Sequence, residues 1–152
     1  MFPFIHLNRL NMDLHNLSRD ELILEVKTLR LANEELLREE YDFRNLIEIS
    51  PVAMVVVHEW RTIYFNPAAL ELFGAQSQEE LMDRHILEFI HPSYHEQTKR
   101  NALMLAEKGY VDTQEQLFVK LDGSLLDVET RAKSIHFNHD HATLVVINDI
   151  TQ

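Results

Sequence analysis

The segment Ile63–Gly74, IYFNPAALELFG, carries the clearest structural signals in the chain. It opens with β-branched and aromatic residues, which are typical of a strand. Asn66 suits the cap of a helix, and Pro67 suits its first turn, because a proline there fixes φ near the helical value. Gly74 can take the left-handed conformation that ends a helix. The segment therefore predicts a strand that runs directly into a short helix at residues 68–73.

Two segments further along the chain add to this pattern. LDGSLLDVE at residues 121–129 contains an Asp-Gly turn signal, and VVINDIT at residues 145–151 is an apolar run that ends in Asp-Ile-Thr. An Asn-Pro-Ala helix start, an Asp-Gly-Ser turn and a terminal Asp-Ile-Thr, in this order, resemble the PAS family of signalling domains. The resemblance covers roughly residues 50–151. It implies a sensor module with an α+β fold, in which a five-stranded antiparallel sheet carries helices on one face.

The remaining elements of this domain follow from local signals. Ser77 with Glu80 and Ser93 with Glu96 have the spacing of a capping box, so each pair predicts the start of a helix. Gly109 predicts the end of the second of these helices. Runs of β-branched and apolar residues between turn signals predict five strands, at residues 52–58, 62–65, 112–121, 124–137 and 141–149.

A long helix is predicted ahead of the domain, at residues 18–49. Ser18 and Glu21 form a capping box at its start. Spacings of three and four residues then alternate along an apolar seam, as in the a and d positions of a coiled coil. Asn33 falls at an a position, where a buried amide favours a two-stranded parallel pair. We therefore predict a homodimer with an interface of Leu22, Val26, Leu29, Asn33, Leu36, Phe43 and Ile47.

These signals divide the chain into an N-terminal segment at residues 1–17, for which no structure is predicted, a coiled-coil-like signalling helix at 18–49 and a PAS sensor domain at 50–152. A charged Glu40 at an a position of the seam favours an alternative, in which the helix packs back on its own domain. With 152 residues, of which 45% are hydrophobic, the chain can bury one core.

Bulk composition excludes several functions. A formal net charge of -11 argues against binding to nucleic acid or to anionic membranes, because both require clustered cations. The chain has no cysteine, which excludes disulfides, thiolate nucleophiles and cysteine-based zinc sites. Its longest apolar run, Val52–Val57, is far shorter than the ~20 residues that span a bilayer. We expect a soluble, cytoplasmic protein.

Haem and flavin are both disfavoured by comparison with PAS relatives that bind them. The resemblance implies that a haem-binding domain takes an axial histidine from the long helix, in a window where this chain has Thr98 and Lys99. It also implies that a flavin-binding domain uses a cysteine, absent from this sequence, and amides at the positions of Phe118, Val128 and Ile147. We expect no cofactor.

The resemblance also implies a cavity between the sheet and the helices. The same comparison, counted from Gly123, predicts which side chains face this cavity. They are Tyr94, Thr98, Gln114, Gln116, Phe118, Val128, Thr130 and Ile147. This lining suits a neutral or weakly polar small molecule, and ordinary core packing is the alternative. Trp60 is interpreted as a surface or interface aromatic. We interpret the polar cluster near the last predicted turn as a solvated turn, with a metal site as the alternative. The cluster consists of His136, His139, Asp140 and His141.

The sequence thus predicts a dimeric PAS module that detects a small-molecule or redox signal. It would relay this signal to an effector outside the chain, such as a histidine kinase of a two-component system or a diguanylate cyclase. Asp149 and Thr151 lie where relatives continue into an output helix, so we assign them to signal relay. The alternative is a constitutive dimerisation or protein-interaction domain without a ligand. No catalytic motif is recognisable, so an enzyme is not predicted.

Overall fold

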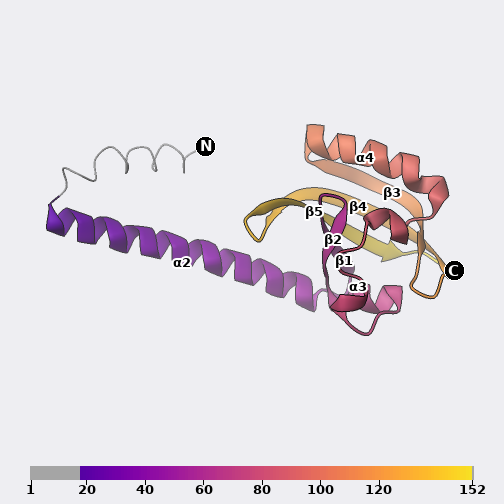
Figure 1. The fold of residues 1–152 in the computed structure, drawn as a ribbon, viewed down its shortest axis with the longest axis horizontal. Coiled ribbons are helices and arrows are strands. Elements are labelled where there is room, and N and C mark those ends of the chain that lie inside the picture. The colour runs from indigo at the N-terminus through magenta and orange to yellow at the C-terminus, as the bar shows by residue number, and fades with distance from the viewer. Residues whose placement is uncertain (1–17, 152) are drawn as a thin grey trace. The chain divides into compact units, whose positions relative to one another are not determined.

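The computed structural model describes residues 18–151, so the predictions for residues 1–17 lie outside it. The chain divides into two compact units, one ending at Phe43 and the other beginning at Arg44. The first unit holds most of the long N-terminal helix. The second holds the end of that helix and the whole sheet, shown in Figure 1.

The N-terminal helix α2 spans Arg19–Ile49, close to the predicted bounds. The predicted capping box is formed, because the Ser18 N–H donates to Glu21 Oε2 at 2.7 Å and the Glu21 N–H donates to Ser18 Oγ at 3.3 Å. This pair satisfies backbone groups that the first turn of a helix leaves without partners. Among residues 18–151, none of the helices combines the length and the hydrophobicity that a membrane span requires.

Five strands form one antiparallel sheet, which confirms the predicted fold class. They pair in the order β2-β1-β5-β4-β3, so the first hairpin joins the last three strands through the β1–β5 pair (Figure 1). The strands are β1 (Ala53–His58), β2 (Arg61–Phe65), β3 (Tyr110–Val119), β4 (Leu125–Phe137) and β5 (Asp140–Asp149).

Two helices and three short 3₁₀ turns lie between β2 and β3. Helix α3 (Pro67–Phe73) begins as predicted, because Asn66 Oδ1 accepts a backbone N–H of its first turn at 2.9 Å. It ends at Gly74, where φ is 76°. Helix α4 (His95–Lys108) ends at the predicted Gly109. The 3₁₀ turns are η1 (Gln78–Glu80), η2 (Ile86–Phe89) and η3 (Pro92–Tyr94).

Of two further predicted helix starts, the one at Ser77 is formed but opens only a short 3₁₀ turn, and the one at Ser93 is wrong. Glu80 does accept the Ser77 N–H at 3.1 Å, but the pair opens only the three-residue turn η1. The chain then leaves the helical path and takes a left-handed φ of 58° at Asp83. Ser93 does not cap α4 either, because it lies inside η3, which has a proline at its first position. Helix α4 begins only at His95.

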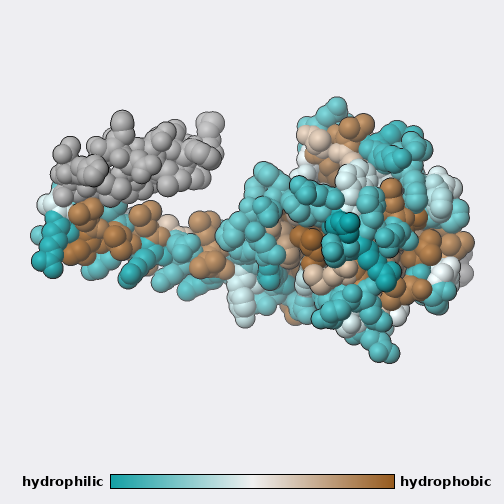
Figure 2. All heavy atoms as spheres, viewed as in Figure 1, coloured by the Kyte–Doolittle hydropathy of each residue, from teal (hydrophilic) through white to brown (hydrophobic). Residues whose placement is uncertain are grey.

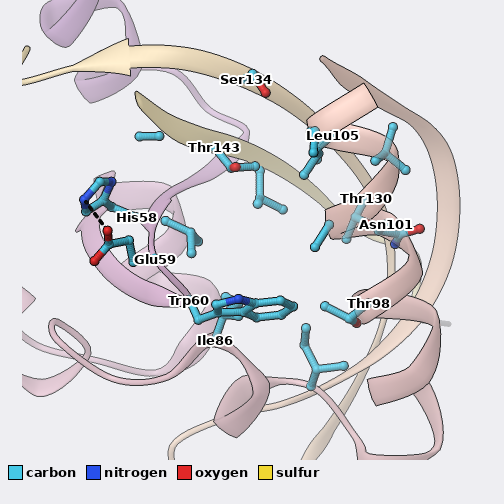
Figure 3. Close-up of a pocket in the computed structure, with 18 of the residues that line it drawn as sticks. His58, Glu59, Trp60, Ile86, Thr98, Asn101, Leu105, Thr130, Ser134 and Thr143 are labelled. Carbon is cyan, nitrogen blue, oxygen red and sulfur yellow. Dashed lines mark ion pairs between the residues drawn. The ribbon is translucent and has the colours of Figure 1, made fainter. Parts of the chain in front are cut away.

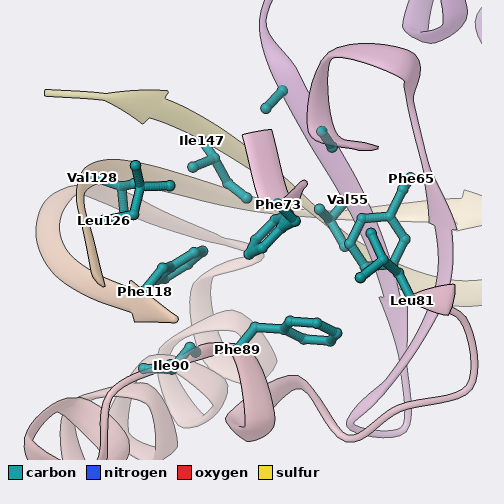
Figure 4. Close-up of a cluster of buried hydrophobic side chains, with 12 residues drawn as sticks. Val55, Phe65, Phe73, Leu81, Phe89, Ile90, Phe118, Leu126, Val128 and Ile147 are labelled. Atoms are coloured by element: carbon teal, nitrogen blue, oxygen red, sulfur yellow. The ribbon is translucent and has the colours of Figure 1, made fainter. Parts of the chain in front are cut away.

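The hydrophobic core occupies the part of the sheet face that α3 and η2 cover (Figure 4). Aromatic rings fill it: the centroids of Phe73 and Phe89 are 5.3 Å apart, and those of Phe73 and Phe118 are 6.0 Å apart. Such ring pairs add to the free energy gained from burial alone. Val128 and Ile147, which the sequence directs toward a cavity, are buried in this cluster. This end of the domain is therefore filled.

Candidate functional site

A cavity of about 640 Å³ lies between α4 and the sheet, next to the filled core. Small residues on its walls create the space, with Ala102 and Ala106 on α4 and Ala132 and Ser134 on β4. Figure 3 shows these walls, with the β1–β2 turn at one end. Small-molecule sites have volumes of roughly 300–1,000 Å³, so the cavity has the size of such a site.

The predicted lining residues separate into three groups. The cavity wall contains Thr98, Gln116, Phe118 and Thr130. Val128 and Ile147 belong to the core that α3 and η2 cover. Tyr94 packs against that core, and Gln114 lies outside the wall, where its side chain bonds to α4. Alternation along the strands thus predicted which face each side chain points to, but not which part of that face is open.

Hydrogen bonds between polar side chains connect α4 to the sheet at one wall of the cavity. Buried Gln116 donates from Nε2 to Thr98 Oγ1 at 3.3 Å and accepts from Thr130 Oγ1 at 3.2 Å. Thr98 Oγ1 donates in turn to the Tyr94 carbonyl at 2.9 Å. A second link joins α4 to Gln114, whose Oε1 accepts at 2.7 Å and 2.9 Å from Gln97 and Asn101.

Helix α4 covers the cavity without being buried itself. None of its residues is fully buried, although Ala102, Leu105 and Ala106 line the cavity. At its first residue, His95 Nε2 lies 3.0 Å from the Leu87 carbonyl oxygen and 2.7 Å from that of Ile90, so this nitrogen carries the proton and donates. The helix is thus fixed at its start, while its apolar face meets open volume.

Trp60 is 37% exposed, in agreement with its interpretation as a surface aromatic, and it also lines the cavity. Its ring stacks on His85, with centroids 5.7 Å apart and an angle of 14° between the planes. Its φ of 69° is left-handed, a conformation that costs a residue with a side chain roughly 1–2 kcal/mol. The sequence did contain a signal for this left-handed φ. Only a short link separates the two predicted strands, and two-residue hairpin turns require left-handed φ values.

The polar residues around the β4–β5 turn make ring and backbone contacts. The rings of His136 and His141 have centroids 4.4 Å apart, and His58 Nδ1 lies 2.6 Å from the His141 carbonyl oxygen. The turn itself is Asn138-His139, with left-handed φ values of 51° and 69°. Within residues 18–151, no group of three or more His, Asp or Glu side chains is arranged to hold a metal ion.

Comparison with known proteins identifies the family. The sequence profile of the PAS domain matches residues 51–152. The chain belongs to the PAS domain family. It therefore contains a sensor domain of the kind found in signalling proteins.

Individual relatives agree with this assignment. Sporulation kinase A of Bacillus subtilis (strain 168) is 26% identical over 110 residues, a match that covers 72% of this chain but only 18% of the kinase. A PAS domain structure from Colwellia psychrerythraea has a TM-score of 0.62 at 20% identity, covering 73% of this chain and 96% of that one. A PAS domain from a two-component sensor histidine kinase has a TM-score of 0.58 at 15% identity, covering 78% and 98%. The two structures share the fold.

The predicted relay residues of this PAS domain lie at the end of β5 and are tied to β4. The Thr151 N–H donates to Asp149 Oδ1 at 2.8 Å. Thr151 Oγ1 accepts from the Asp127 N–H at 3.1 Å and donates to the Asp127 carbonyl at 3.3 Å. Hydrogen bonds from the hydroxyl and the N–H of Thr151 hold the pKa of Asp149 below its ordinary value.

Asp149→Ala should lower the free energy of unfolding at neutral pH, and this loss should become smaller in acid. A carboxylate whose pKa is lowered by folding stabilises the fold above its ordinary pKa, and this contribution is lost as the pH falls through the lowered pKa. The effect should be small, because the side chain is exposed. Urea midpoints of the two proteins should therefore converge below the ordinary aspartate range. An equal difference at both pH values would show that the charge of Asp149 is not involved.

Asn66 joins three elements of the PAS domain through one fully buried side chain. Its Oδ1 accepts the N–H groups of Met54 and Ala69, both at 2.9 Å. Its Nδ2 donates to the carbonyl oxygens of Ile47 at 2.9 Å and Val52 at 2.8 Å. The amide thereby links the end of α2 to the start of β1 and to the first turn of α3.

A second set of contacts holds the last turns of α2 on the PAS domain. The Arg44 guanidinium lies 4.8 Å from the ring centroid of Phe137, a cation–π geometry. The Tyr64 hydroxyl donates to Glu48, and burial followed by this hydrogen bond raises the pKa of Tyr64 above its ordinary value. Ile47 is only 3% exposed, so it packs within its own unit, and the seam available to a partner helix ends before it.

Proposed function

We propose that the chain is a dimeric PAS sensor module. A neutral or weakly polar small molecule binds in the cavity between α4 and the sheet, and α2 and the end of β5 relay this event to an effector outside the chain. The cavity carries the proposal, because protein interiors are close-packed and a domain that only dimerised would need no volume of about 640 Å³ beside a filled core. The kinase relative favours a histidine kinase of a two-component system as the effector.

We expect the occupant to be neither haem nor flavin, and the module to bind rather than to catalyse. The Nε2 atom of His95 already donates to two backbone carbonyls, so it is unsuited to bind iron. Thr98 occupies the window from which haem-binding relatives supply a histidine. The chain also lacks the cysteine that photosensory flavin domains use.

The seam of α2 supports the dimer. Exposed fractions are 47% for Val26, 47% for Leu29 and 64% for Leu36, and Figure 2 shows hydrophobic side chains along the helix. Contiguous exposed apolar surface on a helix marks an interaction site. The proposed interface comprises Leu22, Val26, Leu29, Asn33, Leu36 and Phe43.

A structural route for the relay supports the proposal as well. The cavity is bounded by β4 and β5, and β5 pairs directly with β1. The start of β1 is bonded to Asn66, which also bonds to the end of α2. The other route leads along β4 to Asp127 and from there to Thr151. A ligand that shifts these strands would therefore act on both ends of the PAS domain, by biasing two arrangements of the dimer.

Ala132→Phe should abolish ligand retention while leaving the protein folded, because the new ring would fill the cavity that Ala132 lines. Native mass spectrometry of the freshly purified protein should show a bound small molecule in the wild type and none in the variant. Leu103→Phe is the matched control, since Leu103 lies on the same helix as the cavity wall but is 67% exposed and outside it. If the wild type retains no small molecule, and if no compound of a metabolite library raises its melting temperature, the constitutive dimerisation domain is favoured instead.

A further inference from the structure

One end of the cavity is formed by a strained turn, and the inference drawn from it rests on the proposed small-molecule function. Glu59 and Trp60 connect β1 to β2 between the paired residues His58 and Arg61, with φ values of 48° and 69°. Turns of this kind favour glycine, asparagine and aspartate, because left-handed φ values are disfavoured for residues with bulky side chains. Strain of this sort is concentrated at functional sites, so the tryptophan itself is the feature to explain.

The surrounding residues hold the Trp60 ring at the cavity. Its carbonyl accepts the Ile86 N–H at 2.7 Å, and its ring stacks on His85. Figure 3 shows the ring beside Ile86, with Thr98 of α4 across from it. The indole N–H bonds to none of the residues that the structure describes. The turn therefore presents an aromatic surface and one unused donor to whatever occupies the cavity.

The charge of the cavity wall selects against anions. No lysine or arginine is among the lining residues that the structure describes. The charged group at the β1–β2 end is Glu59, whose side chain is 86% exposed and 4.0 Å from His58 Nε2. An anion would lose its hydration without gaining a cationic partner, and this cost is large in a partly buried site. The wall therefore disfavours a negatively charged ligand.

A pair of hydroxyl groups lies across the cavity from the tryptophan. Ser134 on β4 and Thr143 on β5 are direct cross-strand partners, and both line the cavity. Figure 3 places them away from the Trp60 ring. Their hydroxyls bond to no other residue within the described part of the chain. Since a hydroxyl both donates and accepts, the pair can bind an amide, a hydroxyl or a carbonyl group of a ligand.

From these observations we propose that the cavity binds an uncharged, flat aromatic compound with one hydrogen-bonding substituent. The ring of the compound packs against Trp60, and the substituent meets the hydroxyls of Ser134 and Thr143. Aromatic packing accounts for a tryptophan at a strained turn position, and the hydroxyl pair gives the ligand an orientation.

Three matched probes test the ligand class on the full chain: 2-naphthamide, the anion 2-naphthoate, and the saturated decahydronaphthalene-2-carboxamide. Trp60 is the only tryptophan, so its single indole N–H resonance in a proton–nitrogen correlation spectrum reports binding at this end of the cavity. We expect 2-naphthamide to shift that resonance and to bind about tenfold more tightly than either other probe. Equal binding of the saturated amide would overturn the aromatic part of the proposal, and equal binding of the anion would overturn the uncharged part.

Variants separate this proposal from the proposed sensor function. Trp60→Leu should weaken 2-naphthamide about tenfold and leave the saturated amide unchanged, because only the aromatic contact is lost. This variant lacks the indole resonance, so its affinities are measured from the backbone amide shifts of cavity residues such as Thr98. Leu103→Phe, which lies outside the cavity wall, should bind 2-naphthamide as the wild type does. Thr143→Val should weaken the binding of 2-naphthamide by severalfold.

Unchanged affinity in Trp60→Leu, with all binding lost in Ala132→Phe, would refute the role of Trp60 but would leave the proposed sensor cavity valid. Absence of any probe binding to the wild type would refute the ligand class, while the native mass spectrum decides the sensor function independently.

Discussion

Asn66→Ala should lower the free energy of unfolding by roughly 3–5 kcal/mol, because one side chain satisfies several buried backbone groups. Without it, the N–H groups of Met54 and Ala69 lose their acceptor, and the carbonyls of Ile47 and Val52 lose their donor. Asn66 is fully buried, so water cannot easily replace the amide. Urea unfolding followed by the fluorescence of the single tryptophan measures the loss.

Two variants serve as controls for this prediction. Asn148→Ala makes the same chemical change at an exposed position of β5 and should alter the free energy of unfolding by less than about 0.5 kcal/mol. Asn66→Asp keeps both acceptor bonds but sets a carboxylate against two carbonyl oxygens. It should be destabilised at neutral pH and recover partly in mild acid, where the protonated acid can donate once. A loss below about 1 kcal/mol in Asn66→Ala would contradict the stabilising role of these bonds.

Asn66 also shows where sequence reasoning stops. The Asn-Pro pair predicted the cap of α3, because a cap bonds to an N–H only three residues away. The two donor bonds of the same amide reach residues 14 and 19 positions earlier in the chain. They depend on how α2 and β1 pack, and local patterns carry no information on that. The five strands, the capping box of α2 and the glycine ends of both PAS helices rest on local signals, and all were predicted. The pairing of β1 with β5 is not local, since it joins Ala53 to Ile147.

The cavity shows the same limit on a larger scale. Alternation placed Val128 and Thr130 on one face of β4, and they do share that face. Val128 is core and Thr130 is cavity wall, because α3 and η2 bring Phe73 and Phe89 over one part of the sheet only. Trp60 is exposed, as interpreted, but its place in the cavity wall was not predicted: turn residues are usually on the surface, and the contact of η2 with the turn is not visible in local patterns.

Removing residues 1–43 should convert a dimer into a folded monomer, since the proposed interface lies on α2 and the compact PAS unit begins at Arg44. The cut must spare the last turns of α2. Arg44 contacts Phe137, Ile47 is buried, and the Ile47 carbonyl is bonded to Asn66. A chain that begins at residue 50 should therefore lose roughly 2–4 kcal/mol of stability, while the chain that begins at residue 44 keeps it. Light scattering gives the mass of each form, and urea unfolding gives its stability.

Point substitutions test the seam itself within the full chain. Leu29 lies in the seam and Leu31 outside it, yet both are exposed, at 47% and 67%. In the proposed dimer, Leu29→Ala removes one interface side chain from each of the two chains. The two losses together cost about 3 kcal/mol of association free energy, so association should weaken about a hundredfold. Leu31→Ala should leave the dimer unchanged. Asn33→Leu should raise the melting temperature and relax the register, because a buried amide at an a position costs stability and fixes the pairing. A dimer equally sensitive to Leu29→Ala and Leu31→Ala would contradict the proposed seam, and a dimer that survives removal of residues 1–43 would place the interface on the PAS domain.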